Sequence, residues 1–318
     1  MNISRRNFIA GAGAAFASSA LTGCGTLGAA GEIEVDPNLT VFLSDIHIEG
    51  GLVEAHHQNA LFAETVEEVL KLRPRPARAV VFGDVARFFG KREDYAAAKP
   101  LLAKLEAAMP VALATGNHDH RIPMSRAFPQ RWAASPVPGR LVTVVDLGTM
   151  DLLLLDSLHE TKPEGEWNAG DGEIGKAQLD WLKRESSARK RPFFVGSHHN
   201  PREINDLGNE ALVHLTGIEN FAGWIHGHDH FWRRDVGLRG WDDSPLNRRP
   251  YRIVSLPSTG YWGDIGFVTV RTSGHGAELT NVERDFFFLN PLKPGERRPQ
   301  EWDRLVEENN GDTVRIDW

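Results

Sequence analysis

Three short apolar runs, separated by segments with helical periodicity, constrain the fold of this chain most strongly. The runs occupy residues 40–44, 79–82 and 111–114, and each has the length and apolar content of a strand buried on both faces. One helical pattern spans 61–70, and another spans 93–109, where we expect Pro100 to interrupt the helix. This order of strands and helices predicts an α/β domain with a largely parallel sheet.

The second half of the chain supplies one further amphipathic helix and six more apolar runs. The helix is expected at 175–189. We expect the first two runs to form a hairpin and the last two to belong to a second, more antiparallel sheet. The six runs lie at 141–147, 150–155, 191–196, 221–225, 251–256 and 266–272.

Polar side chains that can bind metal ions follow directly after five of the apolar runs. Because ligand sites in α/β sheets gather at the carboxyl ends of the strands, we expect these side chains to converge. A glycine precedes three of them and would permit the sharp turn that directs each ligand inward. The residues are Asp45, His47, Asp84, Asn117, His118, Asp119, His198, His199, His228 and His230.

The chemical types in this set indicate a metal centre. Carboxylate, amide and imidazole groups without a thiolate suit Mn, Fe or Zn. Several carboxylates and imidazoles crowded together are costly unless metal ions compensate them. A single Gly-Asp pair is normally a solvated turn, and a single histidine after a strand is normally structural. Five such elements in a fixed order, each after an apolar run, point instead to a shared site.

The elements D-x-H, G-D, G-N-H-D, H and G-H-x-H, in this order, resemble the calcineurin-like metallophosphoesterase family, and the match spans about residues 40–272. The resemblance implies a four-layer α/β fold, with two central mixed β-sheets flanked by α-helices. It also implies two divalent or trivalent metal ions at the sheet ends. One ion would take Asp45, His47 and His230, the other would take Asn117, His228 and one histidine of the pair, and Asp84 would bridge both.

Two features of this ligand set and its surroundings stay open. Within the histidine pair we prefer His198, which follows its strand directly, over His199. The resemblance implies that His118 stabilises developing charge or protonates the leaving oxygen, and that Asp119 orients His118. His120, His159 and His226 are expected to support the site from outside.

The resemblance further implies hydrolysis of a phosphate ester by a hydroxide that bridges the two ions. We expect a phosphodiester to be favoured. Arg87 stands where purple acid phosphatases carry a metal-binding tyrosine, and the Asp-Arg-Gly sequence of Ser/Thr protein phosphatases is absent. We expect Arg87 itself to form a surface ion pair. The alternatives are a phosphomonoesterase with the same centre and a non-catalytic metal-binding scaffold of the same fold.

The net charge and two tryptophans in the loops bear on which class of substrate the protein binds. A formal net charge of −7 offers no basic excess for binding nucleic acid, so we expect a small-molecule phosphate ester instead. Trp132 and Trp167 lie in loops between the motifs, where each would either stack on a base or sugar or pack against the protein.

The N-terminal 24 residues have the organisation of an export signal. Arg5 and Arg6, followed by Phe8 and Ile9, resemble a twin-arginine signal, and the apolar stretch that follows is too short to span a bilayer. Residues 21–24 resemble a lipobox that ends in Cys24. We therefore expect export from a bacterial cytoplasm and a lipoprotein anchored to a membrane through Cys24, facing the periplasm or the cell exterior.

These expectations divide the chain into four parts. The predicted parts are a signal at 1–24, a linker at 25–38, a catalytic domain at 39–289 and a C-terminal extension at 290–318.

Overall fold

A computed structural model of the protein describes residues 33–51, 56–232, 252–287 and 296–318. Residues 33–318 form one compact unit. The export-signal prediction, with Arg5, Arg6 and Cys24, lies outside the described residues. Within the described ranges, none of the helices combines the length and the apolar character needed to cross a membrane.

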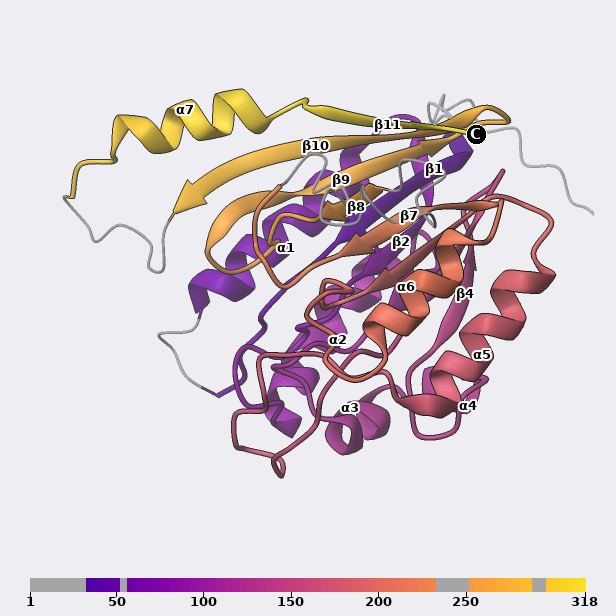
Figure 1. The fold of residues 1–318 in the computed structure, drawn as a ribbon. Coiled ribbons are helices and arrows are strands. Elements are labelled where there is room, and N and C mark those ends of the chain that lie inside the picture. Colours follow the sequence, from indigo (N-terminus) through magenta and orange to yellow (C-terminus); the bar gives the residue numbers. More distant parts are fainter. Residues whose placement is uncertain (1–32, 52–55, 233–251, 288–295) are drawn as a thin grey trace, which may run out of the picture. The chain divides into compact units, whose positions relative to one another are not determined.

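Helices and strands alternate through most of the described chain (Figure 1). The strands are β1 (Val35–Leu43), β2 (Arg75–Val81), β3 (Val111–Leu113), β4 (Thr143–Asp146), β5 (Asp151–Leu154), β6 (Phe193–Ser197), β7 (Phe221–His226), β8 (Arg252–Ser255), β9 (Gly263–Thr272), β10 (Gly276–Phe287) and β11 (Thr313–Asp317). The helices are α1 (His56–Lys71), α2 (Arg92–Glu106), α3 (Arg121–Ala127), α4 (Pro129–Ala133), α5 (Gly175–Ala188), α6 (Gly208–Thr216) and α7 (Gln300–Asn309).

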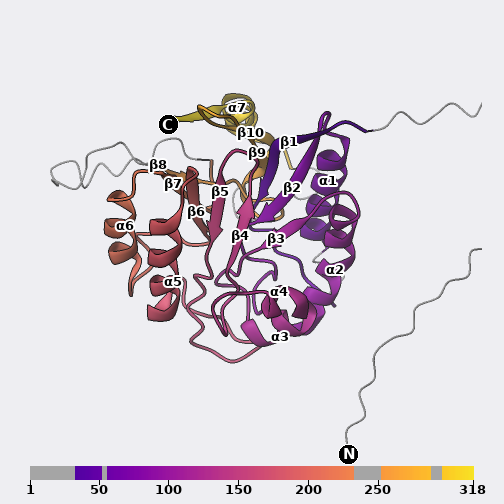
Figure 2. The ribbon, with the colours of Figure 1, turned by 90° about the vertical axis from the view of Figure 1, so that its right-hand side faces the viewer.

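Two mixed β-sheets face each other, and helices cover their outer sides (Figure 2). The six-stranded sheet has the order β11-β10-β9-β1-β2-β3, and the five-stranded sheet has the order β4-β5-β6-β7-β8. Helices α1 and α2 lie outside the first sheet, and α5 and α6 lie outside the second. The predicted four-layer α/β arrangement is therefore confirmed, as is the hairpin of β4 and β5.

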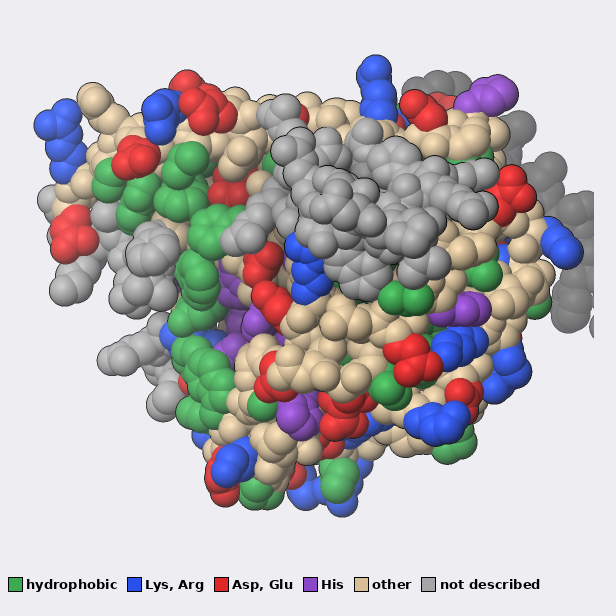
Figure 3. Space-filling view, viewed as in Figure 1, with side chains coloured by type: hydrophobic (Ala, Val, Ile, Leu, Met, Phe, Trp, Pro, Cys, Tyr) green, Lys and Arg blue, Asp and Glu red, His purple; other side chains and the backbone are tan. Residues whose placement is uncertain are grey.

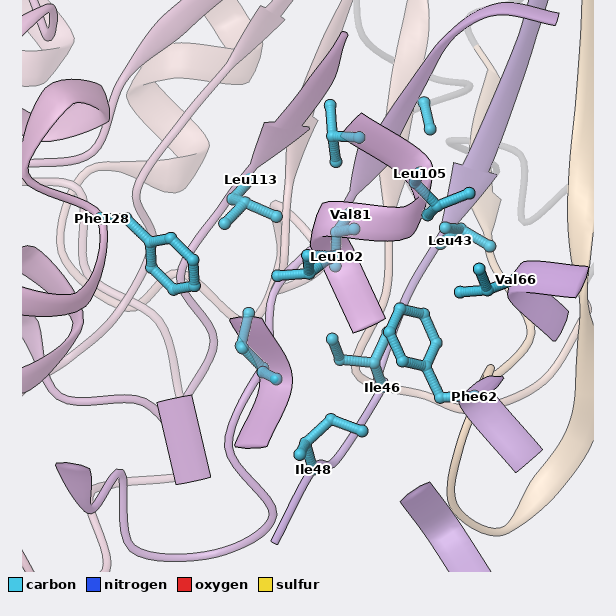
Figure 4. Packing of buried hydrophobic residues seen from close by; sticks show 14 of the residues in the cluster. Leu43, Ile46, Ile48, Phe62, Val66, Val81, Leu102, Leu105, Leu113 and Phe128 are labelled. Carbon is cyan, nitrogen blue, oxygen red and sulfur yellow. The ribbon is translucent and has the colours of Figure 1, made fainter. Parts of the chain in front are cut away.

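Three clusters of buried apolar side chains join these layers. The first lies between α1, α2 and the six-stranded sheet and includes Phe62 and Leu102 (Figure 4). The second lies between the two sheets, where the rings of Phe42 and Phe82 meet at 5.0 Å. The third packs α5 and α6 on the other sheet around the fully buried Trp224. Strands β5 and β6 are buried along their whole length because both of their faces are covered, and each large buried side chain contributes about 1.5–3 kcal/mol.

Pro100 does not interrupt its helix, so that prediction was wrong. Helix α2 runs continuously from Arg92 to Glu106 with Pro100 inside it. Pro100 lies on the exposed side, where water can hydrate the carbonyl that loses its partner. Tyr95 and Leu102, which come before and after Pro100 in the sequence, are buried in the core on the opposite face of the helix. Their burial offsets the cost of about 3 kcal/mol for an internal proline.

The prediction that the two runs at 251–256 and 266–272 share an antiparallel sheet was also wrong. Strand β8 pairs in parallel with β7 in the five-stranded sheet, whereas β9 pairs antiparallel with β1 in the six-stranded sheet. Both runs are short and rich in apolar residues, so their composition does not specify a partner. Strand β11, from the segment 290–318, pairs antiparallel with β10 and forms the edge of the six-stranded sheet.

Candidate metal centre

The carboxyl ends of the central strands bring the predicted ligands together. Strands β1 and β2 run parallel in one sheet, and β6 and β7 run parallel in the other. Asp45 and Asp84 follow the first pair of strands, and His198 and His228 follow the second. His198 Nδ1 bonds the Phe82 carbonyl at 2.8 Å, which links the two sheets at this point. Residues more than a hundred positions apart thus share one site.

One ligand group consists of Asp45, His47, Asp84 and His230, all of them buried. The His47 Nε2 atom is 3.8 Å from Asp45 Oδ1 and 3.6 Å from Asp84 Oδ2. The His230 Nε2 atom is 3.2 Å from Asp45 Oδ1. The four donor atoms lie within 4.8 Å of one another, as the ligands of a single ion must.

A second ligand group adjoins the first and contains His198, His199 and His228. Asn117 Oδ1 is 3.0 Å from both His198 Nε2 and His228 Nδ1, which adds the amide oxygen to this group. His198 Nε2 is also 3.4 Å from Asp84 Oδ2. The Asp84 carboxylate therefore borders both groups.

His199 is a fully buried member of the second group. Its Nδ1 atom bonds the Ser157 hydroxyl at 2.9 Å, whereas its Nε2 atom is buried and has no hydrogen-bond partner. The His199 and His228 ring centroids are 4.9 Å apart. Both histidines of the pair reach the site, and the choice of His198 stays a prediction.

Backbone carbonyls orient three of the imidazoles. His47 Nδ1 bonds the Arg87 carbonyl at 3.0 Å, and His230 Nδ1 bonds the Trp262 carbonyl at 2.9 Å. The His198–Phe82 contact is the third of this kind. Because a carbonyl can only accept, each Nδ1 carries the proton and each Nε2 faces the ligand groups.

The electrostatics of the site call for a cation. Asp45 Oδ1 and Asp84 Oδ2 are buried, and neither accepts a hydrogen bond. Burial raises the pKa of both carboxyls, but the surrounding imidazoles outweigh it and hold each pKa below its usual value. Burial lowers the pKa of His198, yet the Asp84 and Asp45 carboxylates raise it to about 10. A metal ion supplies the positive charge that these oxygens lack, so the residues fit a metal centre.

Five of the proposed ligands have a left-handed backbone conformation that side chains other than glycine rarely adopt. Among the described residues, no other non-glycine residue has a positive φ. Strained backbone of this kind costs about 1–3 kcal/mol per residue and concentrates at functional sites. The angles are 52° at Asp45, 45° at His47, 48° at Asp84, 69° at His228 and 64° at His230.

Glycines are required beside the ligands, but for two of the three the reason differs from the one we predicted. Gly83 does have a positive φ, of 90°. At Gly116, however, a Cβ atom would overlap the Asp84 carboxylate, and at Gly227 it would overlap the Ser44 hydroxyl. These two positions need glycine because side chains approach the backbone closely, and not because the chain turns there.

Asp119 does not orient His118, which corrects the role expected for it. Its carboxylate accepts hydrogen bonds from the Tyr95 hydroxyl at 3.1 Å and from three backbone N–H groups. These contacts tie the loop after β2 to the loop after β3. Burial and the nearby Asp84 charge raise the pKa of Asp119 to about 7, although the backbone hydrogen bonds oppose this. The three N–H groups belong to Val85, Ala86 and Gly116.

His118 lines the open side of the site. Its side chain is 10% exposed, and its Nε2 atom lies 3.8 Å from Asp84 Oδ2. Its Nδ1 atom has no hydrogen-bond partner. Burial lowers the pKa of His118 to about 4, although the Asp84 charge opposes this shift. The backbone N–H of His118 donates to Asp84 Oδ1 at 2.9 Å, which ties the Asp84 carboxylate to the loop that carries His118.

His120, His159 and Arg87 pair with carboxylates outside the two ligand groups. His120 bonds Glu160, and His159 bonds Asp171, so both lie outside the ligand groups, as expected. Arg87 does form an ion pair, with Glu49, but the pair is mostly buried and not on the surface as predicted. The sequence reading missed Ser44, which donates to Asp45 Oδ2 at 2.5 Å, and Ser157 beside His199. It also missed Phe88 and Tyr261, whose rings border the site.

Comparisons with known proteins agree with this geometry. The calcineurin-like phosphoesterase family model matches residues 39–231. The chain is 32% identical over 236 residues to the 3',5'-cyclic adenosine monophosphate phosphodiesterase CpdA of Pseudomonas aeruginosa, covering 70% of this chain and 76% of the relative. It is 26% identical over 204 residues to the glycerophosphodiester phosphodiesterase GpdQ of Enterobacter lignolyticus, covering 60% and 68%.

A solved structure shares the fold. A dimetal phosphatase from Danio rerio superposes with a TM-score of 0.56 at 15% identity, over 76% of this chain and 95% of that one. The family match covers more than half of the chain and includes the loops after β1, β2, β3, β6 and β7. The protein therefore belongs to the calcineurin-like phosphoesterase family, whose members are hydrolases acting on phosphate esters.

Proposed function

We propose that the protein is a two-metal phosphodiesterase that acts on a small-molecule phosphodiester. The observation that carries this proposal is the position of Asp84. Its Oδ2 atom is buried, accepts no hydrogen bond, and lies 3.6 Å from His47 Nε2 and 3.4 Å from His198 Nε2. A carboxylate in this position can bridge two ions held about 3.5–4 Å apart.

The ligands divide between the two ions according to the two groups. Asp45, His47 and His230 would hold one ion, and Asn117, His198 and His228 would hold the other. These oxygen and nitrogen donors suit Mn, Fe or Zn. When bound, the ions supply an activated water and neutralise charge on the phosphoryl oxygens.

His118 acts on the leaving group in this proposal. Its ring lies at the open side of the site, next to the carboxylate that borders both ligand groups. The protonated His118 ring would give its proton to the oxygen that departs from phosphorus, which is general acid catalysis, whereas the neutral ring would only donate a hydrogen bond to that oxygen as charge develops on it. Asp119 contributes by fixing the loops after β2 and β3 and does not take part in the proton transfer.

Two observations favour a diester over a monoester. The relatives CpdA and GpdQ are both named phosphodiesterases. In addition, the Arg87 guanidinium beside the site is paired with Glu49. It therefore adds no free positive charge to hold the second negative charge of a monoester.

Hydrolysis of two chromogenic substrates tests the proposal. We expect the chain from Gly25 onward, supplied with Mn²⁺, to hydrolyse bis-p-nitrophenyl phosphate with a higher kcat/KM than p-nitrophenyl phosphate. Preference for the monoester would replace the proposal with a phosphomonoesterase that has the same centre. Bound metal without turnover of either ester, or of natural diesters, would support the non-catalytic scaffold.

We also propose that the protein is exported and anchored to a membrane by lipidation of Cys24. The order of Arg5, Arg6, a short apolar stretch and a terminal cysteine supports this. Two acyl chains give a stable anchor, whereas one gives only marginal binding. We expect the full chain to incorporate labelled fatty acid and to sediment with membranes, and Cys24→Ala to do neither. An unlabelled, unsedimented wild-type protein would contradict the anchor.

A further inference from the structure

Three aromatic side chains from separate loops meet beside the metal centre. The Phe88 ring centroid is 5.8 Å from that of Trp167, at an interplanar angle of 28°, and 5.8 Å from that of Tyr261, at 89°. The cluster continues into the site, because the Trp167 ring is 4.5 Å from His118 and the Tyr261 ring is 4.8 Å from His47. We call Phe88, Trp167 and Tyr261 the aromatic platform.

The platform is open to solvent although its residues are apolar. Trp167 is 49% exposed, and Phe88 and Tyr261 are only half-buried. In Figure 3 histidine side chains lie in a hollow that hydrophobic side chains border on one side. Exposed aromatic surface next to a buried polar site is typical of a surface that binds a ligand. Trp132, the other tryptophan considered for this role, instead packs against the core cluster of α1 and α2.

The exposed Trp167 is held in place through its neighbours. The Glu166 carbonyl bonds His120 Nε2 at 3.0 Å. On the other side the buried Asn168 donates its Nδ2 to the Asp119 carbonyl at 3.0 Å. Both contacts attach the tryptophan loop to the segment that follows His118. The indole position is therefore fixed relative to the site by residues that flank it, and not by burial of the ring.

Phe88 is likewise fixed from outside the site. The Arg87 guanidinium lies 4.7 Å from the Phe88 ring centroid and is paired with Glu49. The Gly165 N–H donates to the Phe89 carbonyl at 3.1 Å, which joins the phenylalanine loop to the tryptophan loop. An ordered aromatic surface loses little conformational freedom when a flat ring stacks on it.

We propose that the aromatic platform stacks on a flat aromatic ring of the substrate and so selects diesters that carry a nucleobase over diesters of glycerol or amino alcohols. This inference rests on the proposed function, because the phosphate must lie at the metal centre for the ring to reach Trp167. Stacking of a base on an aromatic side chain strengthens binding by about 5- to 150-fold. Trp167 is a specificity-determining residue in this proposal and has no part in bond cleavage.

Two ligands that differ only by the base test the platform. We expect Mn²⁺-loaded protein to bind adenosine 5′-monophosphate at least about tenfold more tightly than ribose 5-phosphate in titration calorimetry. Trp167→Leu is expected to remove most of this preference while the affinity for ribose 5-phosphate, the metal content and the melting temperature stay unchanged. Trp167→Phe is expected to retain most of the preference, because it keeps a flat ring.

Trp318→Leu is the matched control. Trp318 is 38% exposed, but it follows β11 at the end of the six-stranded sheet where β1 begins, away from the metal centre (Figure 1). Equal affinities of the wild type for the two ligands would overturn the platform and leave the phosphoesterase proposal standing. If Trp167→Leu lowered the affinity for both ligands equally, Trp167 would have a structural role and would not select for the base. Failure of the wild type to bind either ligand would overturn the platform, whereas the proposed function is tested separately by hydrolysis of the chromogenic diester.

Discussion

Asp84→Ala is expected to lower kcat/KM for a phosphodiester by at least about a thousandfold and to reduce the bound metal from two ions to one or none. The reason is the position of Asp84 Oδ2 between His47 Nε2 and His198 Nε2. Removing the carboxylate takes away the group that both proposed ions share and leaves the imidazoles facing one another without a bridging anion. Metal analysis after gel filtration and steady-state kinetics on the same sample check both parts.

Two further variants serve as a conservative substitution of Asp84 and as a control for loss of an unrelated carboxylate. Asp84→Asn keeps an oxygen that can accept from the His118 N–H but lowers the charge, so we expect a smaller loss of metal than in Asp84→Ala. Asp180→Ala removes an exposed carboxylate on α5 that pairs with Lys176, and we expect it to change neither quantity. An Asp84→Ala protein with two ions and full activity would show that the bridge has been assigned to the wrong residue.

His118→Asn is expected to lower kcat by about 10²- to 10⁴-fold while the metal content stays at the wild-type value. The side chain borders the ligand groups and is placed to act on the leaving oxygen. We expect a larger loss for a diester with an alkyl leaving group than for bis-p-nitrophenyl phosphate, because p-nitrophenolate departs readily without a proton. Rates on both substrates and metal analysis of the same preparation provide the measurement.

The matched control is His159→Asn, which changes a partly exposed histidine that pairs with Asp171 outside the centre. We expect it to leave both rates unchanged. If His118→Asn lowered kcat equally on the two substrates, the result would argue against proton donation by His118 and for charge stabilisation alone. Loss of metal would instead make His118 a ligand.

Much of the fold and most of the ligand set follow from local sequence patterns. The runs at 40–44, 79–82 and 111–114 are apolar on both faces because each strand is covered twice, and that pattern predicts buried strands wherever they pair. Asp45, Asp84 and His198 lie within three residues of the ends of their strands, and parallel strands carry such residues to the same edge. The order of the motifs therefore predicted the site before any contact was known.

The sequence patterns were weakest where a long-range contact decides the outcome. Apolar composition does not distinguish the partner of β8 from that of β9, since register and neighbours are set when the sheets assemble. The burial of Tyr95 and Leu102 keeps α2 continuous through Pro100, although local propensity alone predicts a break. From sequence alone, the Asp119 carboxylate could either orient His118 or tie two loops together. The folded chain decides for the loops, because Tyr95 and the backbone of the loop after β2 donate hydrogen bonds to this carboxylate.

The sequence by itself determined an α/β fold with buried parallel strands and the residue types at the proposed metal centre, and the order of its motifs carried the resemblance that implied the family and the four-layer arrangement. These depend on short-range order along the chain, namely apolar runs and the polar residues that end them. Only the tertiary structure decided the left-handed backbone at the ligands, the close approach of side chains at Gly116 and Gly227, and the meeting of Phe88, Trp167 and Tyr261. Those features depend on distances between segments remote in sequence, which are fixed by the packing of the two sheets and the loops at their ends.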